Sequence, residues 1–254
     1  MSFANQPADF TLIEDFDASQ FPVWPNHAPN AFWSDEFGNN GGTVSAVADA
    51  TAPQPTGLVD NTYLSMDFKP SLGVGSAPGS LLRDFQPTEQ YRRVFIGFWL
   101  RHDIGWDNNP PPLVKSGVKL MWLGADTAVG SFYCGHDHST MDFSCIQQGQ
   151  VDRQMSANMN VASASLQGRI GSWAKYELLF GMSSNDATAD GTVDVWIDGV
   201  QTHHYTDVRF NGPDSGARVW NSFKWNPTFG GGGSPPEHDQ FQSISHIRLM
   251  GSNP

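Results

Sequence analysis

The chain has 254 residues and a formal net charge of −12, and only 16% of its residues are charged. Because nucleic acids and anionic membranes are bound mainly through Lys and Arg, this balance excludes a non-specific binder of either. The low charged fraction argues against a coiled coil or helical bundle, and nine Trp and seventeen Phe argue against disorder. No stretch approaches the roughly 18 apolar residues of a membrane span.

Alternation of apolar and polar residues with a period of two predicts β-strands along the whole chain, whereas helical periodicity is nearly absent. The expected strands are residues 10–16, 63–68, 94–102, 118–123, 131–134, 143–147, 174–180, 192–197, 200–205 and 244–250. The Gly- and Pro-rich stretches between them are short, as expected for surface loops. We therefore predict a single all-β domain over residues 1–254, an antiparallel double-sheet jelly roll.

The strand at residues 94–102 has two different faces. One phase is apolar and fits a core; it carries Val94, Ile96, Phe98 and Leu100. The other phase is aromatic and charged, with Trp99 and Arg101 about 7 Å apart along the strand. If that side of the sheet is an open, concave groove, Trp99 stacks on a sugar ring while Arg101 binds a carboxylate. The alternative is a structural ion pair of Arg101 with Asp103 or with another acidic residue on the neighbouring strand.

Several segments, taken in order, resemble the concanavalin-A-like jelly rolls of polysaccharide lyases and related carbohydrate-binding proteins, with a heparin-lyase-like and glucuronan-lyase-like fold. They are residues 13–17 (IEDFD), 97–101 (GFWLR), 119–124 (KLMWLG), 171–177 (GSWAKYE), 189–200 (ADGTVDVWIDGV) and 225–231 (WNPTFGG). The resemblance implies this architecture and a polysaccharide ligand. It implies no complete catalytic set, because the Glu-x-Asp-x-Glu strand of laminarinase-type glycosidases and the Arg-x-Glu-x-Arg strand of alginate lyases are missing.

The most concentrated polar cluster lies at residues 133–138, with Gln147 nearby. β-Elimination on a uronic-acid polymer needs a group that neutralises the carboxylate, a base that takes the C5 proton and an acid that protonates the leaving oxygen. The candidates for base and acid are Tyr133, His136 and His138. The candidates for binding the carboxylate are Arg101, Lys119 and Gln147. The alternative is a solvated turn whose histidines have no role.

Aromatic side chains are candidates for stacking on sugar rings. They are Trp99, Trp122, Trp196 and Trp225, with core packing as the alternative. The resemblance also implies a structural Ca²⁺ ion, to which Asp15 and backbone oxygens near Gly42 would contribute. The last strand has His246 where an acidic ligand would be expected.

Cys134 and Cys145 are the two cysteines, and we predict a disulfide between them across a hairpin. The alternatives are two buried thiols, or a zinc site formed by the thiolates with His136 and His138. A disulfide suits an extracellular or periplasmic location. The first residues show no signal-peptide pattern.

These observations predict a carbohydrate-active protein that acts on an extracellular polysaccharide, as a β-eliminating lyase of a uronic-acid polymer. The alternative is a non-catalytic glycan-binding or surface structural protein of the same fold, and whether the protein is an enzyme stays open. The net charge of −12 repels an acidic polymer at long range, so the lyase interpretation requires a locally basic groove.

Overall fold

The computed structural model describes residues 3–18, 33–35, 43–53, 61–72, 75–85, 88–106, 118–125, 132–136, 143–147, 169–185, 187–210, 219–229 and 235–253. The strands of these residues are β1 (Thr11–Asp17), β2 (Trp33–Asp35), β3 (Thr43–Ala48), β4 (Thr62–Phe68), β5 (Leu81–Asp84), β6 (Arg93–His102), β7 (Val118–Ala125), β8 (Phe132–His136), β9 (Phe143–Gln147), β10 (Ala174–Gly181), β11 (Gly191–Ile197), β12 (Val200–Val208), β13 (Trp220–Phe229) and β14 (Gln240–Ser252). No helix among the described residues is long and apolar enough to cross a membrane.

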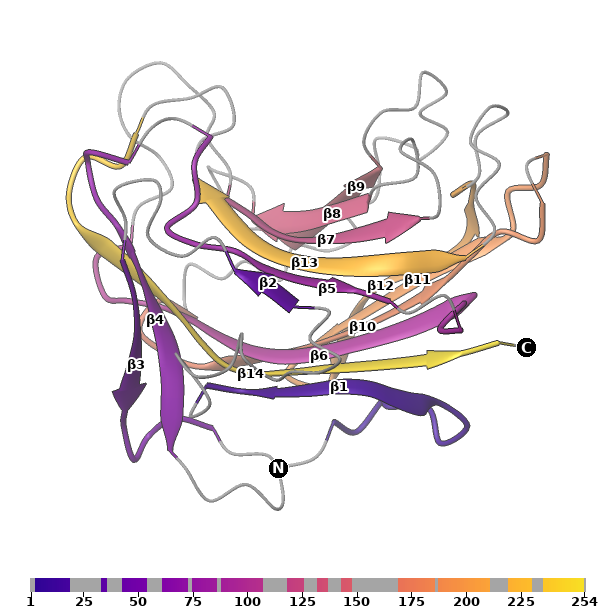
Figure 1. Ribbon diagram of the computed structural model, residues 1–254, viewed down its shortest axis with the longest axis horizontal. Coiled ribbons are helices and arrows are strands. Elements are labelled where there is room, and N and C mark those ends of the chain that lie inside the picture. The colour runs from indigo at the N-terminus through magenta and orange to yellow at the C-terminus, as the bar shows by residue number, and fades with distance from the viewer. Residues whose placement is uncertain are drawn as a thin grey trace.

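The strands form two antiparallel sheets that pack face to face (Figure 1). Sheet A has the order β12-β11-β10-β6-β14-β4-β3, with β1 also paired to β14, and sheet B has the order β2-β5-β13-β7-β8-β9. The predicted all-β double-sheet sandwich is therefore confirmed. The sequence patterns missed β2, β3, β5 and β13. Of these, β13 matters most, because it lies in the middle of sheet B between β5 and β7.

The core between the sheets is formed by the phase of β6 that the sequence predicts. Val94, Ile96, Phe98 and Leu100 are all buried. Phe98 stacks on Tyr176 of β10 with ring centroids 5.0 Å apart, and it meets Trp225 of sheet B edge-on at 5.1 Å. Fully burying one such aromatic side chain stabilises the fold by about 1.5–3 kcal/mol. Aromatic contacts of this kind join the two sheets.

Part of the outer face of sheet A is covered by the N-terminal segment, residues 3–10. Phe3 packs against Gly97, where a Cβ atom would lie 2.6 Å from its ring. The backbone N–H and the side-chain amide of Asn5 donate hydrogen bonds to Glu177 at 2.9 and 3.1 Å. Glu177 is fully buried and also pairs with Lys175 at 3.2 Å. This part of sheet A is therefore closed by the chain itself.

Strands β8 and β9 form a hairpin in which Cys134 stands directly opposite Cys145. The two side chains form a disulfide, with the Cα atoms 4.0 Å apart. Both cysteines are buried against the core. The bond therefore links β8 to the edge strand of sheet B.

Candidate functional site

The outer face of sheet B carries polar and aromatic side chains from β7. Lys119 and Trp122 are half-buried, whereas Leu120, Met121 and Leu123 are buried in the core. In a regular strand, side chains three residues apart point to opposite faces of the sheet. In β7, however, the pairing register shifts between Lys119 and Met121. This irregularity brings both side chains to one face, and the Lys119 Nζ atom lies 5.2 Å from the centre of the Trp122 ring.

Strand β13 adds three residues to the same face. Lys224 stands opposite Trp122 and Thr228 stands opposite Lys119, with Asn226 between them along β13. Lys224, Asn226 and Thr228 line a pocket of about 170 Å³ together with residues 75–77, 79 and 80. We call the residues Lys119, Trp122, Lys224, Asn226 and Thr228 the sheet B face. Figure 1 shows the curved strands β7 and β13 that carry these residues, packed over sheet A.

The charged side chains of the sheet B face are both lysines, although the whole chain is acidic. This face holds two of the five lysines of the sequence, on neighbouring strands. The acidic residue of the paired strands β5, β13 and β7 is Asp84, which stands opposite Ser222, beyond Lys224 along the strand. Ammonium groups, an amide and an indole ring together can bind a carboxylate, hydroxyl groups and the apolar face of a sugar ring.

Two predicted site residues, Lys119 and Trp122, are thus brought together. Tyr133 stands opposite Trp122 in the β7–β8 pairing, and Gln147 stands opposite Phe132 in the β8–β9 pairing. The side chains of Tyr133 and Gln147 lie outside the described part of the structure, as does the whole of His138. The predicted roles of these three residues stay predictions.

The structure corrects the prediction for His136. This side chain is only 2% exposed and points between the sheets, where its ring lies 5.1 Å from His102, 5.5 Å from Phe143 and 5.9 Å from Tyr176. Its inward direction follows from the period of the strand, because it has the same phase in β8 as the buried Cys134. A polymer on the sheet B face cannot reach it. The described residues contain no group of three or more His, Cys, Asp or Glu side chains that could hold a metal ion.

Burial also determines the protonation state of two titratable side chains in this core. The pKa of His102 lies well below its ordinary value, first because burial disfavours the charged ring and then because His136 adds repulsion. Burial raises the pKa of Tyr176 well above the usual range. Both groups therefore stay neutral near pH 7.

Two predicted stacking residues are in the wrong place for a ligand. Trp225 is fully buried between the sheets against Phe98, because the phase of β13 that points inward contains it. Trp99 does lie on the outer face of sheet A, but it is 3% exposed under Phe3, whose ring centroid is 4.6 Å away. Both are structural residues.

Arg101 is likewise a structural residue and not part of an open groove. Its guanidinium lies between the rings of Tyr63 and Trp173, 4.9 and 4.8 Å from their centres. It also pairs with Asp49 at 3.5 Å and Asp103 at 3.6 Å. The ion-pair alternative, weighed for Asp103 from sequence, is the arrangement that the structure shows.

Asp15, the predicted calcium ligand, is held by protein groups. Its carboxylate accepts hydrogen bonds from Arg248 at 2.5 and 3.1 Å, and His246 Nε2 lies 2.6 Å from Oδ1. Burial alone would raise the pKa of Asp15, but the hydrogen bonds and charges of His246 and Arg248 hold it below its ordinary value. A cation here would face the guanidinium of Arg248. Gly42 lies outside the described residues.

The sequence patterns missed Lys224, Asn226 and Thr228. Residues 225–231 read as a loop, since Pro227 and the glycines after it are loop signals. The available signal was the alternation of buried Phe223 and Trp225 with half-buried Lys224 and Asn226. Pro227 is tolerated in the strand because the register shifts between Trp225 and Thr228, at the proline.

The two packed antiparallel sheets define a β-sandwich jelly roll, a fold that polysaccharide lyases also have. Comparison with solved structures bears this out. The chain is similar to the endo-β-1,4-glucuronan lyase of the fungus Trichoderma reesei, with a TM-score of 0.57, 15% identity and 96% of each chain covered. It is similar to the alginate lyase vAL-1 from Chlorella virus, with a TM-score of 0.55 and 12% identity, covering 95% of this chain and 100% of that one.

A further similar structure is the marine PL-14 alginate lyase from Aplysia kurodai, with a TM-score of 0.52 and 9% identity, covering 82% of this chain and 90% of the other. No family model and no curated protein matches the sequence. At identities this low the likeness establishes the fold, and one fold hosts many functions.

Proposed function

We propose that this protein binds an acidic polysaccharide on the sheet B face and cleaves it by β-elimination outside the cell or in the periplasm. The observation that carries the proposal is the presence of Lys119 and Lys224 on neighbouring strands, both beside Trp122. This gives an acidic protein the locally basic surface that a uronic-acid polymer requires. The similar structures are lyases named for glucuronan and alginate, which are polymers of uronic acids.

The chemistry can be assigned to groups of this face. An ammonium group of Lys119 or Lys224 and the amide of Asn226 would neutralise the uronate carboxylate, so that the C5 proton becomes acidic. A base takes that proton, its electron pair forms the C4–C5 double bond, and the C4–O bond breaks as the leaving oxygen gains a proton. Tyr133, opposite Trp122, is our candidate for the proton transfers. Trp122 would support a sugar ring.

The test is the absorbance of the unsaturated product near 235 nm during incubation with polyglucuronate and with alginate. We expect Lys224→Ala to lower kcat/KM by about tenfold or more, since a charge-assisted hydrogen bond contributes about 1.5–3 kcal/mol. Lys69→Ala is the matched control, because Lys69 pairs with Asp67 of β4 in sheet A. Equal losses in both variants would contradict the assignment of the site.

A non-catalytic glycan-binding protein is the second candidate, and the burial of His136 favours it. With His136 in the core, the described part of the sheet B face offers no histidine as a base. Binding of polyglucuronate that weakens with added salt and with Lys224→Ala, without any product at 235 nm, would select this candidate. Neither binding nor product on both polymers would refute the proposed function.

A further inference from the structure

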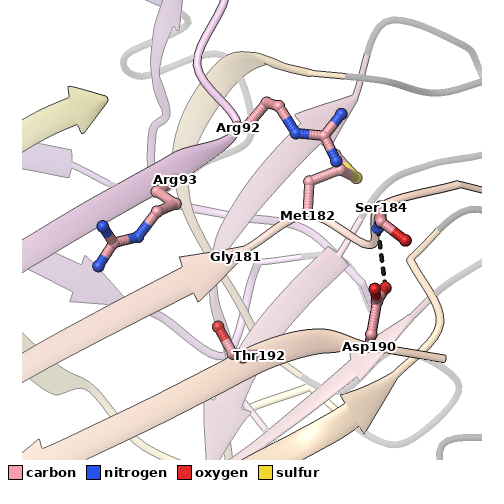
Figure 2. A pocket seen from close by; sticks show the side chains of 7 residues that line it. All are labelled: Arg92, Arg93, Gly181, Met182, Ser184, Asp190 and Thr192. Carbon is pink, nitrogen blue, oxygen red and sulfur yellow. Dashed lines mark hydrogen bonds between the residues drawn. The ribbon is translucent and has the colours of Figure 1, made fainter. Parts of the chain in front are cut away.

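A second pocket opens on the outer side of sheet A, so it lies on the other sheet from the sheet B face. Figure 2 shows it at the ends of β6, β10 and β11. Its volume is about 370 Å³, which lies within the range of about 300–1,000 Å³ that small-ligand pockets occupy. Arg93, the first residue of β6, and Arg92, directly before it, line one side of the pocket. Thr192 near the start of β11 and Asp190, directly before that strand, line it as well.

A glycine in the middle of this pocket leaves space for a ligand, because it has no side chain. Arg93, Gly181 and Thr192 stand in one row across β6, β10 and β11. A Cβ atom on Gly181 would lie 2.5 Å from the Thr192 hydroxyl oxygen. Any side chain there would fill the hollow between Arg93 and Thr192.

Arg93 lines this pocket with a partly exposed guanidinium. The side chain is 38% exposed, and its acidic contact is Asp9 at 3.7 Å, a residue that is itself 70% exposed. Such a surface pair is weak and readily exchanged for another carboxylate. The guanidinium lies over the ring of Phe10 at 4.8 Å, and Phe10 is buried. The ring therefore orients a planar donor group that suits bidentate binding of a carboxylate.

The other side of the pocket accepts hydrogen bonds. Asp190 lies across Gly181 from Arg93 in Figure 2, and its carboxylate accepts the Ser184 backbone N–H at 2.8 Å. Hydrogen bonds from the side chain and backbone of Ser184 hold the pKa of Asp190 below its ordinary value, so this carboxylate is charged near pH 7. Arg92 is anchored by its own bond to the Ser183 carbonyl at 2.6 Å and fixes the rim.

We propose that this pocket binds one carboxylate-bearing sugar residue, with its carboxylate on Arg93 and its hydroxyl groups on Asp190 and Thr192. The choice of an acidic sugar rests on the proposed function, but the site is separate from the sheet B face. A neutral sugar would make no use of the Arg93 cation. A small inorganic anion would make no use of Asp190 and would be repelled by it.

The test is an amide NMR titration of the whole chain with sodium glucuronate, up to tens of millimolar, as suits a single-residue ligand. We expect the Gly181 and Thr192 amides to shift with glucuronate and to shift much less with glucose or acetate. Arg93→Gln should weaken glucuronate binding by about tenfold. Arg169→Gln is the matched control: Arg169 has a similar exposure of 35% and pairs with Asp198 outside the pocket.

No shift at Gly181 and Thr192, equal shifts with acetate, or equal affinity in the Arg93→Gln and wild-type proteins would overturn the proposal. Lys224→Ala separates the two sites. If the pocket amides respond to glucuronate in this variant and in the wild type, but the wild-type protein neither binds nor cleaves polymer, the proposed function alone fails. If polymer is cleaved and these amides do not respond, the pocket proposal alone fails.

Discussion

His102 makes the stability of this protein sensitive to mild acid. The side chain is 5% exposed at the end of β6. It contacts Gln242 of β14 at 3.0 Å, and its ring lies 5.1 Å from His136 of β8 and 4.6 Å from Trp106. Tyr176 of β10 borders the same small cavity. None of these neighbours offers a negative charge that would stabilise an imidazolium ion.

The sign of the effect follows from the lowered pKa of His102. The unfolded chain, in which the histidine pKa is about 6.5, binds this proton at a higher pH than the folded protein does. The free energy of unfolding therefore falls as the pH drops below about 6.5, by about 1.4 kcal/mol per pH unit for this one proton. The loss continues down to the folded pKa. Between pH 7.5 and 5.5 it amounts to about 1.4 kcal/mol, or about 3–6 °C in Tm.

The assay is urea unfolding, followed by tryptophan fluorescence, at a series of pH values between 7.5 and 5.5. His102→Gln removes the titrating group and keeps an amide beside Gln242, so we expect a lower stability at pH 7.5 but a flatter pH dependence. His204→Gln is the matched control, because His204 is 63% exposed and contacts Asp194. The same slope in wild-type and His102→Gln proteins would refute the reasoning.

Three further predictions concern structural contacts. Replacing both Cys134 and Cys145 by Ala should lower the free energy of unfolding by about 3 kcal/mol, which is the chain-entropy value for so short a loop. Urea unfolding measures this loss. Equal stability of the wild-type protein with and without reductant would contradict the prediction. Gly97→Ala should displace Phe3 and cost about 1.5–3 kcal/mol, read out as faster proteolysis of the N-terminal segment. Arg101→Ala should lower Tm and leave polysaccharide binding unchanged, since its contacts are within the protein; weaker binding with an unchanged Tm would restore the groove interpretation.

The all-β fold could be predicted from sequence because the alternation of apolar and polar residues that identifies a strand is a local property of the chain. The period-two pattern of β6 identifies both the strand and its core phase, from Val94 to Leu100. The faces could not be predicted in the same way. Whether the outer phase of β6 is open depends on Phe3, more than ninety residues earlier in the chain.

The candidate site was only half predictable for a related reason. Lys119 and Trp122 were singled out by residue type, but their common face depends on a register shift that no residue pattern in β7 announces. Their partners on β13 were hidden by Pro227. His136 was attractive as an acid–base group because it lies beside other polar residues in sequence, yet alternation along β8 puts it on the inner side with Cys134.

We expect the net charge of −12 to oppose binding of an acidic polymer at the sheet B face less than its size suggests. Several acidic residues of sheet A and its neighbouring segments are already paired: Asp15 with Arg248, Glu177 with Lys175, and Asp49 with Arg101. Packed sheets lie about 10 Å apart, which is also about the Debye length at 0.1 M salt. Acidic groups on the solvent side of sheet A lie farther than this from the outer side of sheet B, so salt in the surrounding solution weakens their effect on a bound polymer more than it weakens the effect of Lys119 and Lys224. A lower salt concentration increases the Debye length, which strengthens repulsion by the distant acidic groups as well as attraction by the lysines. The affinity for the polymer should therefore level off at low salt and should not keep rising.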